Sequence, residues 1–179
     1  MKMLKKLLAV VLTGAMALTL LTACGGNAVN DKNIADALND IVKSSVAAGM
    51  HEDYTFKPRA NEQAMAKAIA ALSESERHQT EKVMKILEID KNGANETSRF
   101  VWWGAVFADG IGTTGQAYNV MDKILNKDAL NADKLTGKKP GAIRHIGTAL
   151  GTMTDPKGGK LVKVRIIVVT AEAEPVDKK

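Results

Sequence analysis

Leu161-Val-Lys-Val-Arg-Ile-Ile-Val-Val-Thr-Ala-Glu-Ala173 is the most informative segment of this chain for its fold. Four apolar side chains share one face of it in an extended conformation: Val162, Val164, Ile166 and Val168. On the other face, Lys163 and Arg165 come first, and Ile167 and Val169 then make that face apolar as well. Strands that are apolar on both faces are covered on both sides in folded proteins. We therefore expect a central strand in a sheet with helices on each face.

The segments just before this stretch predict the strand that pairs with it. Ile143 to Met153 is also apolar in character, and Asp155-Pro156-Lys157-Gly158-Gly159 has the composition of a turn. The two apolar segments are therefore expected to form a β-hairpin. Phe100 to Phe107 predicts a further strand or extended segment, and core packing is the expected use of its two tryptophans, the alternative being an exposed ligand or membrane platform.

Helical periodicity dominates the part of the chain upstream of the hairpin. Helices are expected over about 32–48, 61–72, 73–87 and 114–126, the third of them opened by a capping box at Ser73 to Glu76. Residues 50–60 predict a connecting loop, and residues 127–141 predict a polar loop with one helical turn. Helices combined with a covered sheet indicate an α/β fold, specifically a three-layer α/β/α sandwich with a mainly antiparallel sheet.

The N-terminus predicts where the protein works. Lys2, Lys5 and Lys6 precede an apolar run that ends in Leu21-Thr22-Ala23-Cys24, which resembles a bacterial lipobox. This resemblance implies a signal peptide over residues 1–23 and lipidation of Cys24; an uncut signal anchor is the alternative. Residues 24–31 would then be a tether, 32–174 a single domain and 175–179 a tail. We expect a lipid anchor in the cell membrane or outer membrane, with the domain facing the periplasm or the exterior.

Charge and cysteine content narrow the possible partners and cofactors. The chain has 25 Lys and Arg against 20 Asp and Glu, and without residues 1–23 the ratio becomes 22 to 20. Such a balance gives no support to nucleic-acid binding, so no nucleic-acid partner is expected. Cys24 is the only cysteine, which leaves no disulfide and no Cys-rich zinc site in the processed chain. We expect no cofactor and no bound metal.

The strongest motif for a ligand site is glycine-rich. Gly110, Gly112 and Gly115 match the dinucleotide pattern Gly-x-Gly-x-x-Gly ahead of a predicted helix. No βαβ unit surrounds the motif, and the simpler interpretation is a turn whose following helix is capped by Thr113 or Thr114. The three histidines, His51, His78 and His145, lie far apart in sequence, and no serine lies in a nucleophile elbow.

Several segments taken together resemble the CAP superfamily, the cysteine-rich secretory, antigen 5 and pathogenesis-related proteins. Gly104-Ala-Val-Phe-Ala-Asp-Gly110 is similar to the family's Gly-Glu-Asn-[Ile/Val]-Ala-x-Gly segment, and Arg144-His-Ile-Gly-Thr-Ala-Leu-Gly151 is similar to its closing hairpin. Leu38 and Asn39 with Gly49 resemble its opening helix, and Ala64 to Leu72 its Ala-rich second helix. The resemblance implies a CAP-like α/β/α fold.

The same resemblance implies a cleft in which two His and two acidic residues hold a divalent metal. This chain departs from that pattern, because Ala105 and Val106 stand where the family motif has Glu and Asn. The second family histidine falls near Asn126 to Asp128, which contains no histidine, and His78 matches the first only loosely. A degenerate member without the metal cleft is therefore expected.

Three functions remain open from the sequence. The first is a non-enzymatic module, with no catalytic residues, that binds an envelope protein, cell-wall material or a lipid; its candidate ligand-binding residues are His78, Gly104, Gly110, Gly112, Thr113, Thr114 and His145. The alternative is a cell-surface hydrolase, a peptidase or cell-wall enzyme, that uses His78 or His145 as its base with an acid nearby. The third is a structural component of an envelope complex.

Overall fold

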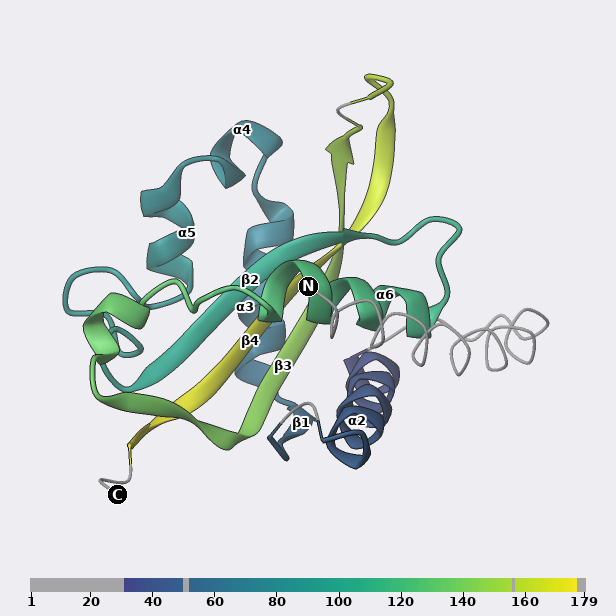
Figure 1. The fold of residues 1–179 in the computed structure, drawn as a ribbon. Coiled ribbons are helices and arrows are strands. Elements are labelled where there is room, and N and C mark those ends of the chain that lie inside the picture. The colour runs from purple at the N-terminus through teal and green to yellow at the C-terminus, as the bar shows by residue number, and fades with distance from the viewer. Residues whose placement is uncertain (1–30, 50–51, 156, 177–179) are drawn as a thin grey trace.

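The computed structural model describes residues 31–49, 52–155 and 157–176, and Figure 1 shows a mixed α/β fold. The predicted signal peptide, Cys24, most of the tether, His51 and the last three residues lie outside the described part. The α-helices found there are α2 (Asp31–Ala47), α3 (Ala60–Ala71), α4 (Glu74–Arg77), α5 (Thr80–Ile86) and α6 (Thr113–Val120). A π-helical turn, η1 (Met121–Leu125), continues α6, and a short 3₁₀ turn, η2 (Ala132–Leu135), follows.

Four strands form one mixed sheet in the order β1-β3-β4-β2. They are β1 (Thr55–Pro58), β2 (Arg99–Phe107), β3 (Lys138–Thr154) and β4 (Leu161–Pro175). β3 and β2 both pair antiparallel with β4, whereas β1 pairs parallel with β3. The expected hairpin and the central position of β4 are confirmed. In Figure 1 the tips of β3 and β4 extend beyond α6 as a two-stranded arm.

Two hydrophobic clusters lie against opposite faces of the sheet. Consecutive side chains of a strand point to opposite faces, and consecutive residues of β4 belong to different clusters. One contains Ile167 and Val169 of β4 with Leu38 of α2 and Val120 of α6. The other contains Val164, Ile166 and Val168 of β4 with Met65 and Ile69 of α3 and Val83 of α5. Residues of α2 and α6 thus belong to one cluster and residues of α3 and α5 to the other.

The closest helix–sheet contact is made at Gly147 of β3. A Cβ atom built on Gly147 would lie 2.0 Å from the backbone nitrogen of Gln63 and 2.1 Å from the carbonyl carbon of Glu62. Backbone atoms cannot move aside as a flexible side chain can, so only glycine fits here. This contact fixes α3 beside β3.

The aromatic residues are mainly core, as expected. Trp102 and Phe100 are buried and stack with ring centroids 6.0 Å apart. The guanidinium carbon of Arg144 lies 4.7 Å from the ring centroid of Tyr54 and 5.1 Å from that of Trp102, a double cation–π contact. Trp103 is half-buried against the α3 side of the sheet.

Some sequence-based expectations about local structure were wrong. Residues 50–60 are not all loop, because Thr55–Pro58 forms β1; only Phe56 of this strand is buried, so no alternating pattern marks it. The helix expected over 73–87 is two helices, α4 and α5, although its capping box at Ser73 is confirmed. The N-cap of α6 is Gly112, without a side-chain hydrogen bond, so neither Thr113 nor Thr114 caps it.

Candidate functional site

The outer edge of β3 is open over part of its length. β1 covers β3 only from Ile143 to Ile146, and from Gly147 onward no strand pairs with this edge among the described residues. Long open edges invite unwanted pairing, and folded proteins usually protect them. A part of this edge that is left unprotected is therefore a position where a partner strand could bind.

Side chains cap the outward backbone groups of β3 on both sides of Leu150. The backbone N–H of Thr148 donates to Asp31 Oδ1 at 3.0 Å, and that of Thr154 donates to Glu74 Oε2 at 3.1 Å. The guanidinium of Arg77 donates to the carbonyl oxygen of Thr152. Since residues two apart on a strand present their backbone groups to the same edge, Leu150 also faces outward.

The backbone at Leu150 is left without such a cap. Its N–H and C=O have no hydrogen-bond partner among the described residues, and neither do the C=O of Thr148 and the N–H of Thr152. The side chain of Leu150 is 58% exposed. These four free backbone groups form one continuous window on the edge.

A groove of about 520 Å³ runs along this window. Its floor is the edge of β3, and its walls come from α3, the first residue of α2 and one residue of β4. The lining residues are Asp31, Gln63, Lys67, Ala70, Ala71, Thr148, Ala149, Leu150 and Arg165. Small residues on the α3 wall leave space next to the strand.

A chain of hydrogen bonds crosses the sheet beneath the groove. Asp31 Oδ1 accepts a hydrogen bond from the Thr148 hydroxyl at 2.5 Å, and that hydroxyl accepts one from Arg165 Nη1 at 3.1 Å. Arg165 Nε donates to Gln116 Oε1 at 2.8 Å, and Gln116 in turn donates to the carbonyl oxygen of Ile111 at 2.8 Å. The groove is thereby connected to the loop ahead of α6.

Arg165 is the unusual member of this chain of contacts. Only 5% of it is exposed, although it lines the groove. Burial lowers the pKa of its guanidinium, and the negative charge of Asp31 offsets this in part. Its hydrogen-bond acceptors are the neutral groups of Gln116 and Thr148, and no carboxylate oxygen of the described residues lies within ion-pair distance. A buried cation without a direct counter-ion favours an anionic group in the groove.

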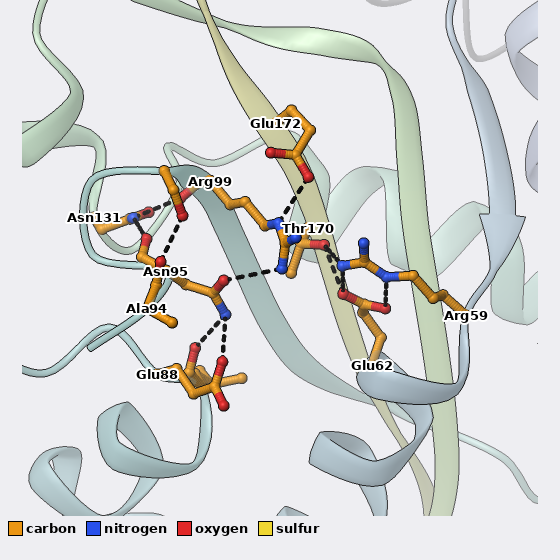
Figure 2. A network of polar contacts seen from close by, with 11 residues as sticks. Arg59, Glu62, Glu88, Ala94, Asn95, Arg99, Asn131, Thr170 and Glu172 are labelled. Atoms are coloured by element: carbon orange, nitrogen blue, oxygen red, sulfur yellow. Dashed lines mark hydrogen bonds and ion pairs between the residues drawn. The ribbon is translucent and has the colours of Figure 1, made fainter.

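A second polar network fixes the start of the α3 wall. Figure 2 shows Arg59 and Glu62 side by side, with the Glu62 carboxylate accepting two hydrogen bonds from Arg59 and one from the Thr170 hydroxyl at 2.8 Å. Burial raises the pKa of Glu62, but the hydrogen bonds from Arg59 and Thr170 outweigh it and leave the pKa below its usual value. Glu62 is fully buried, so this network attaches α3 firmly to β4.

Figure 2 also shows a neighbouring group of polar contacts around Arg99, at the start of β2. Arg99 Nε donates to Glu172 Oε1 at 2.8 Å, and Arg99 Nη1 donates to Asn95 Oδ1 at 3.3 Å. The Asn131 amide donates to the carbonyl oxygens of Asn95 and Arg99 at 3.0 and 2.7 Å. These contacts fasten the loop before β2 to the sheet and do not reach the groove.

The structure does not bring the predicted histidines together. His145 lies on β3 opposite Thr170, whereas His78 caps the C-terminus of α4, next to Arg77, which contacts Thr152. His145 and Thr152 are seven positions apart on the strand, a distance of about 23 Å. Burial and then the positive charge of Arg59 lower the pKa of His145. Glu62, whose negative charge acts on His145, is already held by Arg59 and Thr170.

The predicted glycine and threonine residues also lie outside the groove lining. Gly104 packs against Ile124, where a Cβ would approach to 2.8 Å. Gly110 adopts a positive φ of 70° in the turn after β2, and Gly112 precedes α6. Thr113 and Thr114 form the first turn of α6. This region reaches the groove only indirectly, through the contact between Gln116 and Arg165.

Sequence reasoning missed the residues that line the groove. Arg165 carried the clearest available signal, since a cation between Val164 and Ile166 in an apolar strand needs a polar neighbour. Asp31 and Lys67 gave none, because one begins a helix and the other lies on an exposed helix face.

No group of three or more His, Cys, Asp or Glu side chains that could hold a metal ion occurs within residues 31–49, 52–155 and 157–176. No helix in that same part of the chain is long and apolar enough to cross a membrane. Comparison with models of known families, with curated proteins and with solved structures gave no significant match in any of the three.

Proposed function

We propose that this chain is a lipid-anchored extracytoplasmic domain, CAP-like and non-enzymatic, that binds an envelope partner or ligand in the groove beside β3. One observation carries the proposal: an open groove on a free strand edge, lined by a buried arginine that has no ion-pair partner among the described residues. Grooves that combine an apolar surface with a few fixed polar groups are typical binding sites.

The arrangement of elements supports the CAP-like part of the proposal. The resemblance implied an opening helix, an Ala-rich second helix and a closing hairpin, and α2, α3 and the β3–β4 hairpin occupy those positions. The two hydrophobic clusters on opposite faces of β4 support the three-layer α/β/α arrangement. We extend the proposal to fold only, because Ala105 and Val106 replace the family's polar cleft residues.

The proposed anchor would hold the groove near the membrane. Asp31 lines the groove, and only the six residues 25–30 lie between it and Cys24. Even a fully extended chain of that length spans only about 25 Å. Ligands within reach would therefore be membrane-proximal proteins, cell-wall material or lipid head groups.

Site-specific photo-crosslinking in cells tests this function. A photoreactive amino acid replaces Lys67 in the groove, and a second strain carries it instead at Lys43, an exposed lysine of α2 outside the lining. We expect adducts of discrete mass from position 67 and none from position 43. Equal labelling at both positions, or none at either, would contradict a binding role for the groove.

A further inference from the structure

We propose that the groove takes an extended peptide segment carrying an acidic group, which adds as a fifth strand to the edge of β3 at Leu150. This inference rests on the proposed binding function and names the chemical class of its ligand. Strand addition to an open sheet edge is a common mode of peptide recognition, in which backbone hydrogen bonds supply affinity and side-chain pockets supply specificity.

The pattern of capped and free backbone groups carries the argument. β1 protects the edge up to Ile146, Asp31 caps the N–H of Thr148, and Arg77 caps the C=O of Thr152. Between these caps lie two free N–H groups and two free C=O groups, centred on Leu150. A strand opposite Leu150 would bond to all four and would be stopped on either side by the caps. The window therefore fits a segment of about three to five residues.

The walls of the groove select for charge. Arg165 and Lys67 provide two cations, and the carboxylate of Asp31 is already engaged by Thr148 and Gln63. An acidic side chain or a terminal carboxylate on the added segment would give Arg165 the direct ion pair that it lacks, since Asp31 reaches it only through the Thr148 hydroxyl. Exposed Leu150 would at the same time be covered by the neighbouring side chain of the segment.

The charges favour a foreign segment over a second copy of this chain. In a symmetric pair, the edge of one copy would face residues 147–154 of the other, and this stretch, Gly-Thr-Ala-Leu-Gly-Thr-Met-Thr, contains no acid. The tether residues Gly25 to Asn30 contain none either. Neither occupant would neutralise Arg165, whereas an acidic segment of another protein would.

The test uses the full-length purified protein and a display library of random linear twelve-residue peptides as the probe. We expect enriched peptides to carry an Asp or Glu, and their binding to be measured by fluorescence anisotropy. Leu150→Pro removes the central N–H but no bond to β4, because that N–H faces outward; Leu150→Ala removes the same side chain and keeps the N–H. The proline variant should weaken binding at least tenfold and the alanine variant less than threefold.

A charge-reversal pair tests the acidic group. Lys67→Glu should weaken binding of the selected peptides at least tenfold, whereas Lys43→Glu, the same change on an exposed part of α2, should leave it unchanged.

N-methylation of the peptide residue opposite Leu150 repeats the backbone test with unmodified protein, in case Leu150→Pro lowers the melting temperature. Hydrogen exchange should slow at the amides of Leu150 and Thr152 on binding, while those of Ala149 and Gly151, which face β4, stay unchanged.

Several outcomes would overturn the inference. Selected peptides that bind the alanine and proline variants equally would not bind by strand addition. An edge that proves to be a dimer contact, shown by a mass that halves in Leu150→Pro, would assign the window to a second copy. Failure to enrich any peptide, while position 67 still crosslinks in cells, would reject a peptide ligand and leave the binding function intact. Loss of both signals would reject the binding function as well.

Discussion

At Gly147 a single missing methyl group determines where α3 lies. The backbone of Glu62 and Gln63 occupies the space that a Cβ would need, so the first turn of α3 contacts the strand directly. Because α3 also forms one wall of the groove, the glycine positions the site without lining it.

We therefore expect Gly147→Ala to destabilise the protein strongly, by about 3 kcal/mol, since backbone rather than a side chain has to move. Gly151→Ala is the matched control on the same strand: its Cβ would meet side-chain atoms at 3.4 Å or more, and we expect a change below about 1 kcal/mol. Urea denaturation measures both. Equal free energies of unfolding for the two variants would contradict the close contact.

Glu62 links stability to pH. Its pKa is lowered in the folded state, because the hydrogen bonds from Arg59 and Thr170 outweigh the effect of burial. A carboxyl group with a depressed folded pKa stabilises the fold above its unfolded pKa of about 4.5, and this stabilisation is lost as the pH falls through the folded value. Glu62→Gln should cost about 2–3 kcal/mol at pH 7.

The difference in free energy of unfolding between wild type and Glu62→Gln should shrink steadily below about pH 4.5. Denaturation with urea at several pH values from 7 to 3 follows it. A difference that stays constant over this range would show that Glu62 has no depressed pKa.

Among the elements, β1 depends most on contacts far away in the sequence. Asn39 of α2 holds it through two hydrogen bonds to one residue: its Nδ2 donates to the carbonyl oxygen of Phe56 at 3.0 Å, and its Oδ1 accepts from the N–H of Phe56 at 2.7 Å. An amide side chain thus does for β1 what a neighbouring strand would otherwise do.

Removing this amide should loosen β1 selectively. We expect Asn39→Ala to cost about 2 kcal/mol and to speed hydrogen exchange at the amide of Phe56. Lys43→Ala, at an exposed position one turn further along α2, is the control and should change neither. Unaltered exchange at Phe56 in the Asn39 variant would show that pairing with β3 alone holds the strand.

The elements also show what sequence patterns can and cannot predict. β4 was predictable because both its faces are apolar: the neighbouring residues Ile167 and Val168 point to opposite faces, and both are fully buried. β1 was not, because Phe56 is its one buried residue and its order comes from Asn39 and β3. The groove was missed for the same reason, since Asp31, Lys67 and Arg165 meet only after α2, α3 and β4 have packed.

For the whole molecule, the proposed lipid attachment at Cys24 determines how far from the membrane the groove can lie. Replacing Cys24 by Ala removes the thiol that would carry the lipid. In cells fed a palmitate analogue, we expect the wild-type protein to be labelled and to fractionate with membranes, and Cys24→Ala to lose the label at equal expression. A variant that is labelled like the wild type would refute the lipobox.

The central strand of the sheet is the last one to be synthesised. β2 has β4 as its strand partner, and β3 needs β4 to complete the hairpin, so neither cluster of the core can close before residue 161 onward is available. At about 5–20 residues per second, the ribosome needs roughly 10–30 s to reach that point. Until then the nascent chain exposes its apolar segments to proteases and chaperones. Chains truncated before β4 would lack residues of both core clusters and would therefore be recognised as unfolded.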